Sequence, residues 1–222
     1  FTHAGLPDEA ARNDHGHGWD HFVERLGVAA ETGDAGWNPW AAGPEDLDLL
    51  SASEAALALL LETSRSLPDR ALDQATPCEQ FSVAELLDHL DHSLTSLGQV
   101  AGGAEPSGGV DQRPEARLAS KAGTTLEAWR DRGLEGELDF AGGHHPAVVP
   151  ASILLMELFV HGWDLAHALD RPFDPTPQLV AFADEHIRAV IPPERGTAFG
   201  APLPEDGSDP LEALLAFTGR GR

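Results

Sequence analysis

The chain has 222 residues, 41% of them hydrophobic, so it is long enough for one full-sized domain with a buried core. Acidic residues outnumber Lys and Arg by 37 to 14, which gives a formal net charge of −23. This excess excludes the basic surface that binding to nucleic acid or to anionic membranes requires. The acidic residues are dispersed along the chain, which is typical of a well-solvated surface.

Targeting signals are not evident in the sequence. No apolar run approaches the roughly eighteen residues that span a bilayer, and the N-terminus lacks the basic and apolar regions of a signal peptide. The single cysteine, Cys78, excludes an internal disulfide and fits a reducing compartment. We therefore expect a cytoplasmic protein.

Residues 1–33 read as one turn-and-helix unit. Pro7 and Asp8 open a helix that we expect to close at Gly27. Its apolar residues recur at helical spacing: Trp19, Phe22, Val23 and Leu26. Residues 34–44 are rich in Gly and Pro and predict a linker. Because a lone helix cannot form its own core, we expect the first segment to be the tail of a domain whose body is absent.

Two stretches of this segment, Thr2–Glu9 (THAGLPDE) and Gly18–His21 (GWDH), carry a resemblance. They resemble the final helix of START-like (SRPBCC) domains. The resemblance lacks the cavity-forming sheet of those domains, so no ligand-binding function follows from it.

From residue 45 to residue 222 the pattern is strongly helical. Ser82 with Glu85 predicts a capping box, and Thr176 and Asp209 predict two further helix starts. We expect helices over residues 45–66, 82–100, 114–133, 151–169, from 176 to before Pro192, and 210–218. The segments 101–113 and Gly142–Pro146 are expected to be loops, and no strand pattern is strong. The sequence predicts an all-α fold, a four-helix bundle with appended C-terminal helices.

The predicted helix 151–169 carries an unusual polar stripe. Glu157 lies within an eight-residue apolar run and His161 follows four residues later. At roughly 100° per residue, Glu157, His161 and Asp164 fall within about 60° of one another. An ionised Glu in a buried helix is costly unless a cation or several donors meet it. The stripe therefore predicts a metal site, and the alternative is a buried Glu–His hydrogen bond.

The predicted helix 82–100 offers a third ligand. His89 lies among leucines, whereas His92, the alternative on the same helix, follows beside polar residues and is more readily solvated. His89, Glu157 and His161 form an N,O,N set suited to zinc or a similar divalent ion. Three protein ligands leave a position open for water or substrate, as in catalytic sites. Asp164 is either a fourth ligand or a residue that orients a ligand imidazole.

Three stretches together resemble a known family: Thr76–Val83 (TPCEQFSV), Leu86–Leu90 (LLDHL) and Glu157–Ala166 (ELFVHGWDLA). They resemble the mycothiol-dependent maleylpyruvate isomerase metal-binding domain, which belongs to the DinB-like bundles. The resemblance covers residues 45–222. It implies a divalent ion, with zinc favoured, held by His89, Glu157 and His161. It also implies that the ion activates the sulfur of mycothiol or another low-molecular-weight thiol.

One departure from that family limits the inference. The isomerase proper carries a further C-terminal domain that this chain lacks, so its substrate is not carried over. The functional prediction is a thiol-dependent transferase or isomerase that acts on a small-molecule thiol and an electrophile, with Asp164 assisting catalysis. The alternative is a metal-binding or stress-response module without catalysis. A homodimer is left open as the oligomeric state.

The remaining candidates are interpreted as structural or as surface residues. Cys78 precedes the helix 82–100, where the helix dipole favours a thiolate, but a buried structural cysteine is the preferred interpretation. Six further histidines are interpreted as surface or loop residues rather than ligands: His15, His17, His21, His144, His145 and His167.

Overall fold

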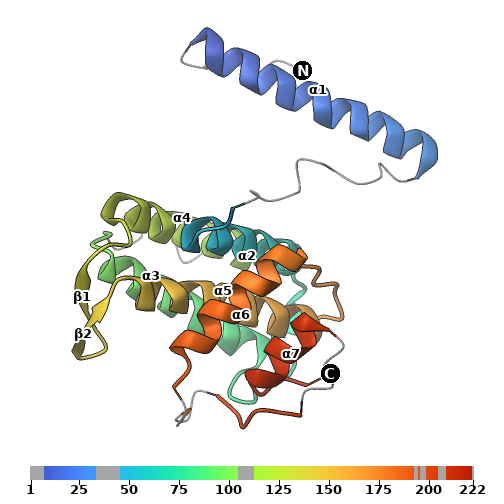
Figure 1. The fold of residues 1–222 in the computed structure, drawn as a ribbon. Coiled ribbons are helices and arrows are strands. Elements are labelled where there is room, and N and C mark those ends of the chain that lie inside the picture. The colour runs from blue at the N-terminus through green and yellow to red at the C-terminus, as the bar shows by residue number, and fades with distance from the viewer. Residues whose placement is uncertain are drawn as a thin grey trace. The chain divides into compact units, whose positions relative to one another are not determined.

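Helices make up most of the described chain (Figure 1). The structure is a computed structural model, and it describes residues 8–33, 46–104, 113–192, 195, 199–204 and 209–221. It divides into two units, residues 1–42 and 43–222. The predicted linker 34–44 and Pro7, the predicted helix opening, lie outside the described residues.

The first unit contains helix α1, Glu9–Thr32. The predicted end at Gly27 is wrong, because the helix continues to Thr32 and the chain leaves it at Gly33, where φ is +84°. A glycine inside a helix costs only about 1 kcal/mol relative to alanine, so it need not end one. The apolar residues predicted to line one side are exposed in α1: Trp19, Phe22, Val23 and Leu26. The likeness to a START-like domain remains a prediction.

Four helices of the second unit form a closed bundle (Figure 1). They are α2 (Leu49–Ser64), α3 (Val83–Val100), α4 (Pro114–Arg132) and α5 (Val148–Ala168). α5 packs between α2 and α3, and α4 completes the ring against both. A 3₁₀ turn, Asp69–Ala71, lies in the connection from α2 to α3. The appended helices α6 (Pro177–Val190) and α7 (Pro210–Phe217) pack on α5 and on α6, respectively. The predicted all-α fold is confirmed.

The predicted caps start three of these helices. Ser82 and Glu85 form the capping box, in which the Ser82 backbone N–H donates to Glu85 Oε2 at 2.8 Å. Thr176 caps α6, and Asp209 caps α7. These caps satisfy backbone N–H groups that the first turn of a helix leaves without partners.

A small hairpin corrects the predicted loop at Gly142–Pro146. Strand β1 (Glu137–Phe140) pairs antiparallel with β2 (Gly143–Pro146), with Leu138 opposite His145. The two-residue turn has positive φ at both Ala141 and Gly142, the backbone that tight hairpins need. The hairpin contacts α3 and α5.

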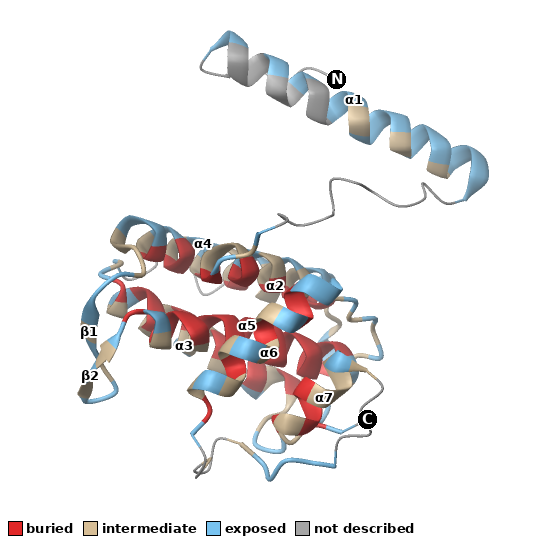
Figure 2. Ribbon diagram, in the orientation of Figure 1, coloured by how far each residue is buried: buried red, intermediate tan, exposed pale blue. Residues whose placement is uncertain are grey.

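α5 is the central helix of the second unit, and nearly all of it is buried (Figure 2). The prediction that no segment could span a bilayer needs correction, because α5 is long and apolar enough by length and composition. However, 83% of that window is buried inside the protein, which is weak evidence for a soluble protein with an apolar core helix. Gly162 permits this packing, since a Cβ there would lie 3.1 Å from the Phe173 ring and 3.6 Å from Leu60 Cβ.

Candidate metal centre

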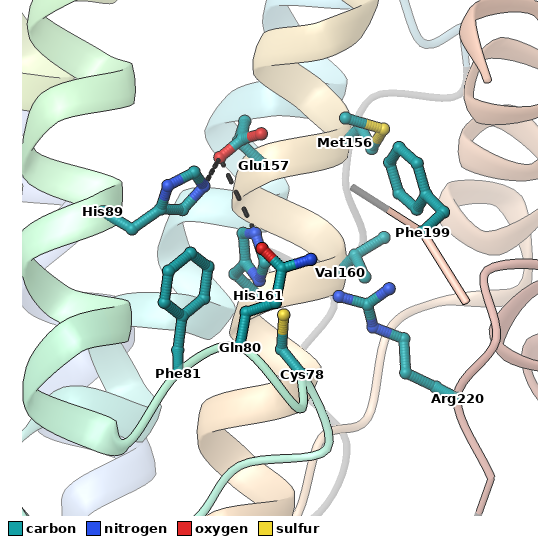
Figure 3. A pocket seen from close by; sticks show the side chains of 10 residues that line it. All are labelled: Cys78, Gln80, Phe81, His89, Met156, Glu157, Val160, His161, Phe199 and Arg220. Atoms are coloured by element: carbon teal, nitrogen blue, oxygen red, sulfur yellow. Dashed lines mark hydrogen bonds and ion pairs between the residues drawn. The ribbon is translucent and has the colours of Figure 1, made fainter. Parts of the chain in front are cut away.

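Helices α3 and α5 bring the three predicted ligands together (Figure 3). His89 projects from α3, and Glu157 and His161 project from α5. One ligand atom from each residue lies within 4.8 Å of the other two. Glu157 Oε2 is 2.8 Å from His89 Nε2 and 3.8 Å from His161 Nε2. The i, i+4 spacing on α5 thus aims an oxygen and a nitrogen at the same point.

These separations can be compared with a real coordination sphere. In a tetrahedral zinc site with bonds of about 2.0–2.1 Å, neighbouring ligand atoms lie about 3.3 Å apart. The observed separations of 2.8 and 3.8 Å fall on either side of that value. Small side-chain movements would therefore convert the cluster into a three-ligand site, and the donor set fits a divalent ion.

A hydrogen bond joins Glu157 to His89 in the place where an ion would lie. Burial alone would raise the pKa of Glu157, but the hydrogen bond from His89 and the nearby His161 hold that pKa below its usual range. The same hydrogen bond raises the pKa of His89. Without an ion, the site favours a negative Glu157 and a positive His89. A divalent cation can stabilise this buried carboxylate better than the protonated imidazole does.

Asp164 lies behind His161 and orients it. Its Oδ2 accepts a hydrogen bond from His161 Nδ1 at 2.9 Å, and the carboxylate is completely buried. With Nδ1 protonated, His161 Nε2 is left free to face the cluster. Of the two predicted roles, the geometry favours an orienting residue over a fourth ligand.

The second partner of Asp164 is Arg220, which the sequence analysis did not identify. Its Nε donates to Asp164 Oδ1 at 3.0 Å and its Nη2 donates to Oδ2 at 2.9 Å. Burial would raise the pKa of Asp164, but the hydrogen bonds from His161 and Arg220 keep that pKa low. No local pattern links positions 164 and 220, so the pair could not be found from helical periodicity.

The loop before α3 forms one wall of the centre. Thr76 holds this loop together, because its hydroxyl contacts the backbone oxygens of Cys78 and Phe81 at 3.0 and 2.8 Å. The Phe81 ring stacks on His89 with centroids 4.7 Å apart. Phe81 therefore restricts the orientation of a ligand imidazole, a role that the sequence analysis missed. Its place in the TPCEQFSV stretch was the available signal.

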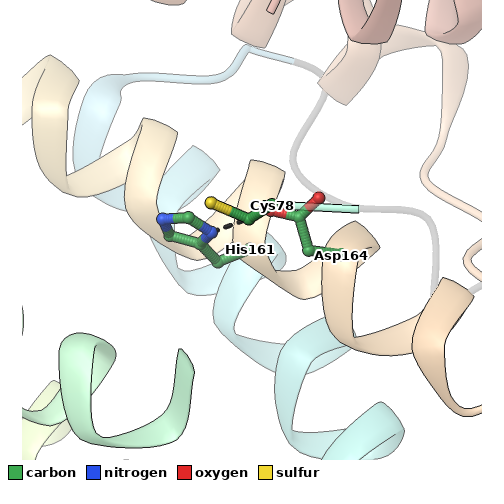
Figure 4. Close-up of side chains that lie close together, drawn as sticks. All are labelled: Cys78, His161 and Asp164. Carbon is green, nitrogen blue, oxygen red and sulfur yellow. Dashed lines mark hydrogen bonds and ion pairs between the residues drawn. The ribbon is translucent and has the colours of Figure 1, made fainter. Parts of the chain in front are cut away.

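Cys78 is buried, as expected of a structural cysteine, but its side chain also lines the centre (Figures 3 and 4). Its sulfur belongs to a second cluster with His161 and Asp164, again within 4.8 Å. Burial raises the pKa of the Cys78 thiol, and Arg220 offsets only part of that effect. The raised pKa is consistent with the preferred interpretation of Cys78 as a structural cysteine.

A cavity of about 140 Å³ opens at the cluster (Figure 3). Its walls combine the polar centre with apolar and sulfur-containing side chains: Phe81, Met156, Val160, Phe199 and Cys78. The cavity is smaller than the roughly 300–1,000 Å³ of pockets that enclose drug-sized ligands. Only the reacting end of a larger molecule fits inside. His89, whose side chain is 29% exposed, is the most accessible of the three candidate ligands.

The other histidines whose side chains the structure describes belong to neither metal-ligand cluster. His92 is exposed, as predicted. His144 pairs with Asp139 on the exposed hairpin, and His167 stacks on Trp163 while remaining exposed. The side chains of two further candidates lie outside the described residues: His15 and His17. His21 and His145 belong to neither of the two metal-ligand clusters of the described residues.

Comparisons with known proteins place the chain beside mycobacterial relatives. It is 26% identical over 151 residues to an uncharacterised protein of Mycobacterium tuberculosis strain CDC 1551/Oshkosh, and equally to one of strain H37Rv. Each match covers 65% of this chain and 82% of the relative. No known protein-family profile and no solved structure matches the chain.

Proposed function

We propose that this chain binds one divalent ion, with zinc favoured, through His89, Glu157 and His161. The observation that carries the proposal is the convergence of two imidazoles and a buried carboxylate on one point, within 4.8 Å. A buried hydrogen bond between His89 and Glu157 is the competing interpretation. It leaves His161 Nε2, which faces the same carboxylate oxygen from 3.8 Å, without a function.

The charge of the buried groups supports a cation. Glu157 and Asp164 contribute two negative charges, and Arg220 contributes one positive charge. In the metal-free centre a proton on His89 balances the remaining negative charge. When both imidazoles are neutral, as metal ligands must be, Glu157, Asp164 and Arg220 sum to −1, which is costly in a buried position unless a cation is present. A divalent ion would change the net charge to +1, which suits the binding of one anionic ligand.

We further propose a cytoplasmic thiol transferase or isomerase as the activity of this centre. A bound divalent ion lowers the pKa of a thiol that coordinates it, and so supplies a thiolate at neutral pH. The residues of the chain would then hold the reacting groups: Asp164 fixes the proton on His161 Nδ1, and the apolar wall excludes water. The resemblance to the mycothiol-dependent domain supports a thiol as the ligand.

The cavity and its cysteine also support an external thiol. The cavity accepts only the reacting end of a molecule, which suits the sulfur-bearing end of a low-molecular-weight thiol. Since the pKa of Cys78 is raised, this residue is a poor nucleophile at neutral pH. A small-molecule electrophile would be the second substrate.

The experiment is a thiol titration of the cobalt-substituted protein. Mycothiol, glutathione and bacillithiol are added in turn, followed by a panel of electrophiles. A new sulfur-to-cobalt absorption band and metal-dependent thiol consumption are expected, and Glu157→Ala should show neither. His92→Ala, on the same helix as His89 but exposed, is the matched control and should behave as wild type. Cobalt binding without any response to thiols would favour the non-catalytic metal-binding module instead.

A further inference from the structure

The turn after α7 places Arg220 at the centre, and its own hydrogen bonds fix its shape. The Thr218 hydroxyl donates to Leu215 O at 2.8 Å, and the Arg220 backbone N–H donates to the same oxygen at 2.9 Å. Gly219 adopts φ +83°, a conformation that favours glycine. A Cβ at Gly219 would also lie 3.0 Å from Gly200 Cα. The turn therefore has little freedom to adopt another shape.

The guanidinium that this turn delivers is almost completely buried. Arg220 is 5% exposed, and its Nη1 also donates to Thr218 O at 3.0 Å. Two of its nitrogens donate to Asp164, so the planar fork fixes both oxygens of that carboxylate. Asp164 in turn accepts the His161 Nδ1 proton. A continuous chain of hydrogen bonds thus runs from the C-terminal turn to a candidate ligand.

We infer that residues 218–220 form part of the metal centre, with Arg220 as a positioning residue that acts on His161 through Asp164. The inference rests on the proposed metal site. Docking of the turn orients the imidazole and fixes its Nδ1–H tautomer, so Nε2 faces the ion position. Because coupling between two sites is reciprocal, ion binding should also stabilise the docked turn.

Arginine is required here for its shape as well as its charge. A lysine at position 220 would offer one point charge and could not engage both oxygens of Asp164 in a planar fork. Lysine should therefore restore only part of the orienting effect. Residues that support a metal ligand in this way typically change metal affinity by about 10- to 100-fold when they are replaced.

The test compares Arg220→Met and Arg220→Lys with a matched control, Arg171→Met. Arg171 also ties distant segments together, since its Nη1 donates to the backbone oxygens of Thr63 and Arg65, but it does not contact the centre. Zinc affinity should fall by about 10- to 100-fold in Arg220→Met. It should recover partly in Arg220→Lys and stay unchanged in Arg171→Met. Wild-type zinc affinity in Arg220→Met would overturn the inference.

One measurement depends neither on the proposed activity nor on metal binding. In the zinc-free protein, ¹⁵N NMR of the imidazoles should show His161 in the Nδ1–H tautomer, and Arg220→Met should give a mixture of tautomers. An unchanged tautomer in the variant contradicts the positioning role, even if the wild-type chain binds no metal. Absence of metal binding with the tautomer shift intact would instead refute only the proposed function.

Hydrogen exchange in the wild type covers the case in which Arg220→Met does not fold. Zinc should slow exchange of the Arg220 backbone N–H, whose acceptor is Leu215 O. Gly219→Ala, which keeps the Arg220 charge but strains the turn, should weaken zinc binding in the same direction. Equal exchange with and without zinc, together with unchanged affinity in Gly219→Ala, would overturn the coupling.

Discussion

Two clusters of charged side chains lie on the bundle, and they differ in charge and in burial. Between α3 and α4, Asp88 and Asp91 face Arg117 and Lys121. Two negative groups meet two positive groups. Asp88 is 79% exposed, and the other three side chains are 18%, 23% and 27% exposed. We call this set the α3–α4 cluster.

The second set, the α5 cluster, consists of Glu157, Asp164 and Arg220 with the two ligand imidazoles. Its side chains are at most 11% exposed apart from His89, and its charges balance only when His89 carries a proton or an ion is bound. A cluster whose charges balance needs no further ion, and partly exposed ion pairs contribute little to stability. A buried cluster with a charge deficit must take up a proton or a cation. The difference supports the α5 cluster as the proposed binding site.

The largest expected effect is the loss of metal in Glu157→Ala. This substitution removes the charge that attracts the ion and leaves two imidazoles, a weak site. Bound zinc should fall from about one ion per chain to almost none by elemental analysis after dialysis. Asp91→Ala, which removes a carboxylate from the α3–α4 cluster, is the control and should keep its zinc. Full zinc content in Glu157→Ala would contradict the proposal that the α5 cluster, unlike the α3–α4 cluster, binds the ion.

Asp164→Asn should cause the next largest effect, a loss of stability. The substitution leaves Arg220 buried without its counter-charge, which typically costs about 3–5 kcal/mol in free energy of unfolding. Asp88→Asn removes one partner of an exposed pair and should cost about 0–1 kcal/mol. Urea denaturation of the metal-free proteins measures both. We also expect Asp164→Asn to lower the catalytic rate more than the metal content, and equal stability losses would contradict the assignment.

The stability of the metal-free protein and its affinity for zinc should change with pH in opposite directions. The hydrogen bond to Glu157 raises the pKa of His89 above its ordinary value of about 6.5. In the metal-free protein, stability from this pair is present below the unfolded-state pKa and is lost as pH rises through the folded-state pKa. Protons compete with zinc for His89, so zinc affinity should instead fall as pH drops through that raised pKa.

Thermal denaturation and zinc titration from pH 5.5 to 8.5 would measure both trends. His89→Gln removes the titrating group and should flatten the metal-free trend. Zinc affinity that is independent of pH in the wild type would argue against His89 as a ligand.

The smallest expected effect is that of Arg117→Met. Its guanidinium pairs with Asp88 and Asp91 at 3.3 and 3.2 Å, and its side chain is 27% exposed. Removing it should lower the free energy of unfolding by about 0–1 kcal/mol and leave zinc affinity unchanged. A larger loss, or a change in zinc binding, would show that the α3–α4 cluster is more than a set of weak ion pairs.

Features with local causes were predicted well from the sequence. The capping box at Ser82 and the caps at Thr176 and Asp209 act within one helical turn, so they are visible in the sequence. The hairpin was missed because each strand has only four residues and its pairing depends on the turn at Gly142. Gly27 misled the prediction because an interior glycine costs a helix only about 1 kcal/mol relative to alanine and need not end it.

The residues of the candidate site also fall into those that local spacing predicts and those that it does not. The stripe on α5 follows from helical spacing, and His89 stood out because leucines surround it. Arg220 reaches Asp164 across 56 positions and through two appended helices, so no periodicity connects them. Cys78 and Phe81 depend on how the loop before α3 folds back over α5. Such contacts are set by tertiary packing, which local patterns do not encode.

X-ray absorption at the zinc edge tests the central claim most directly. The zinc-loaded chain should show only nitrogen and oxygen neighbours at about 2.0–2.1 Å, including two imidazoles. Addition of mycothiol should add one sulfur neighbour at about 2.3 Å. A spectrum without imidazole scattering, or a chain that retains no zinc after purification and reloading, would contradict the account.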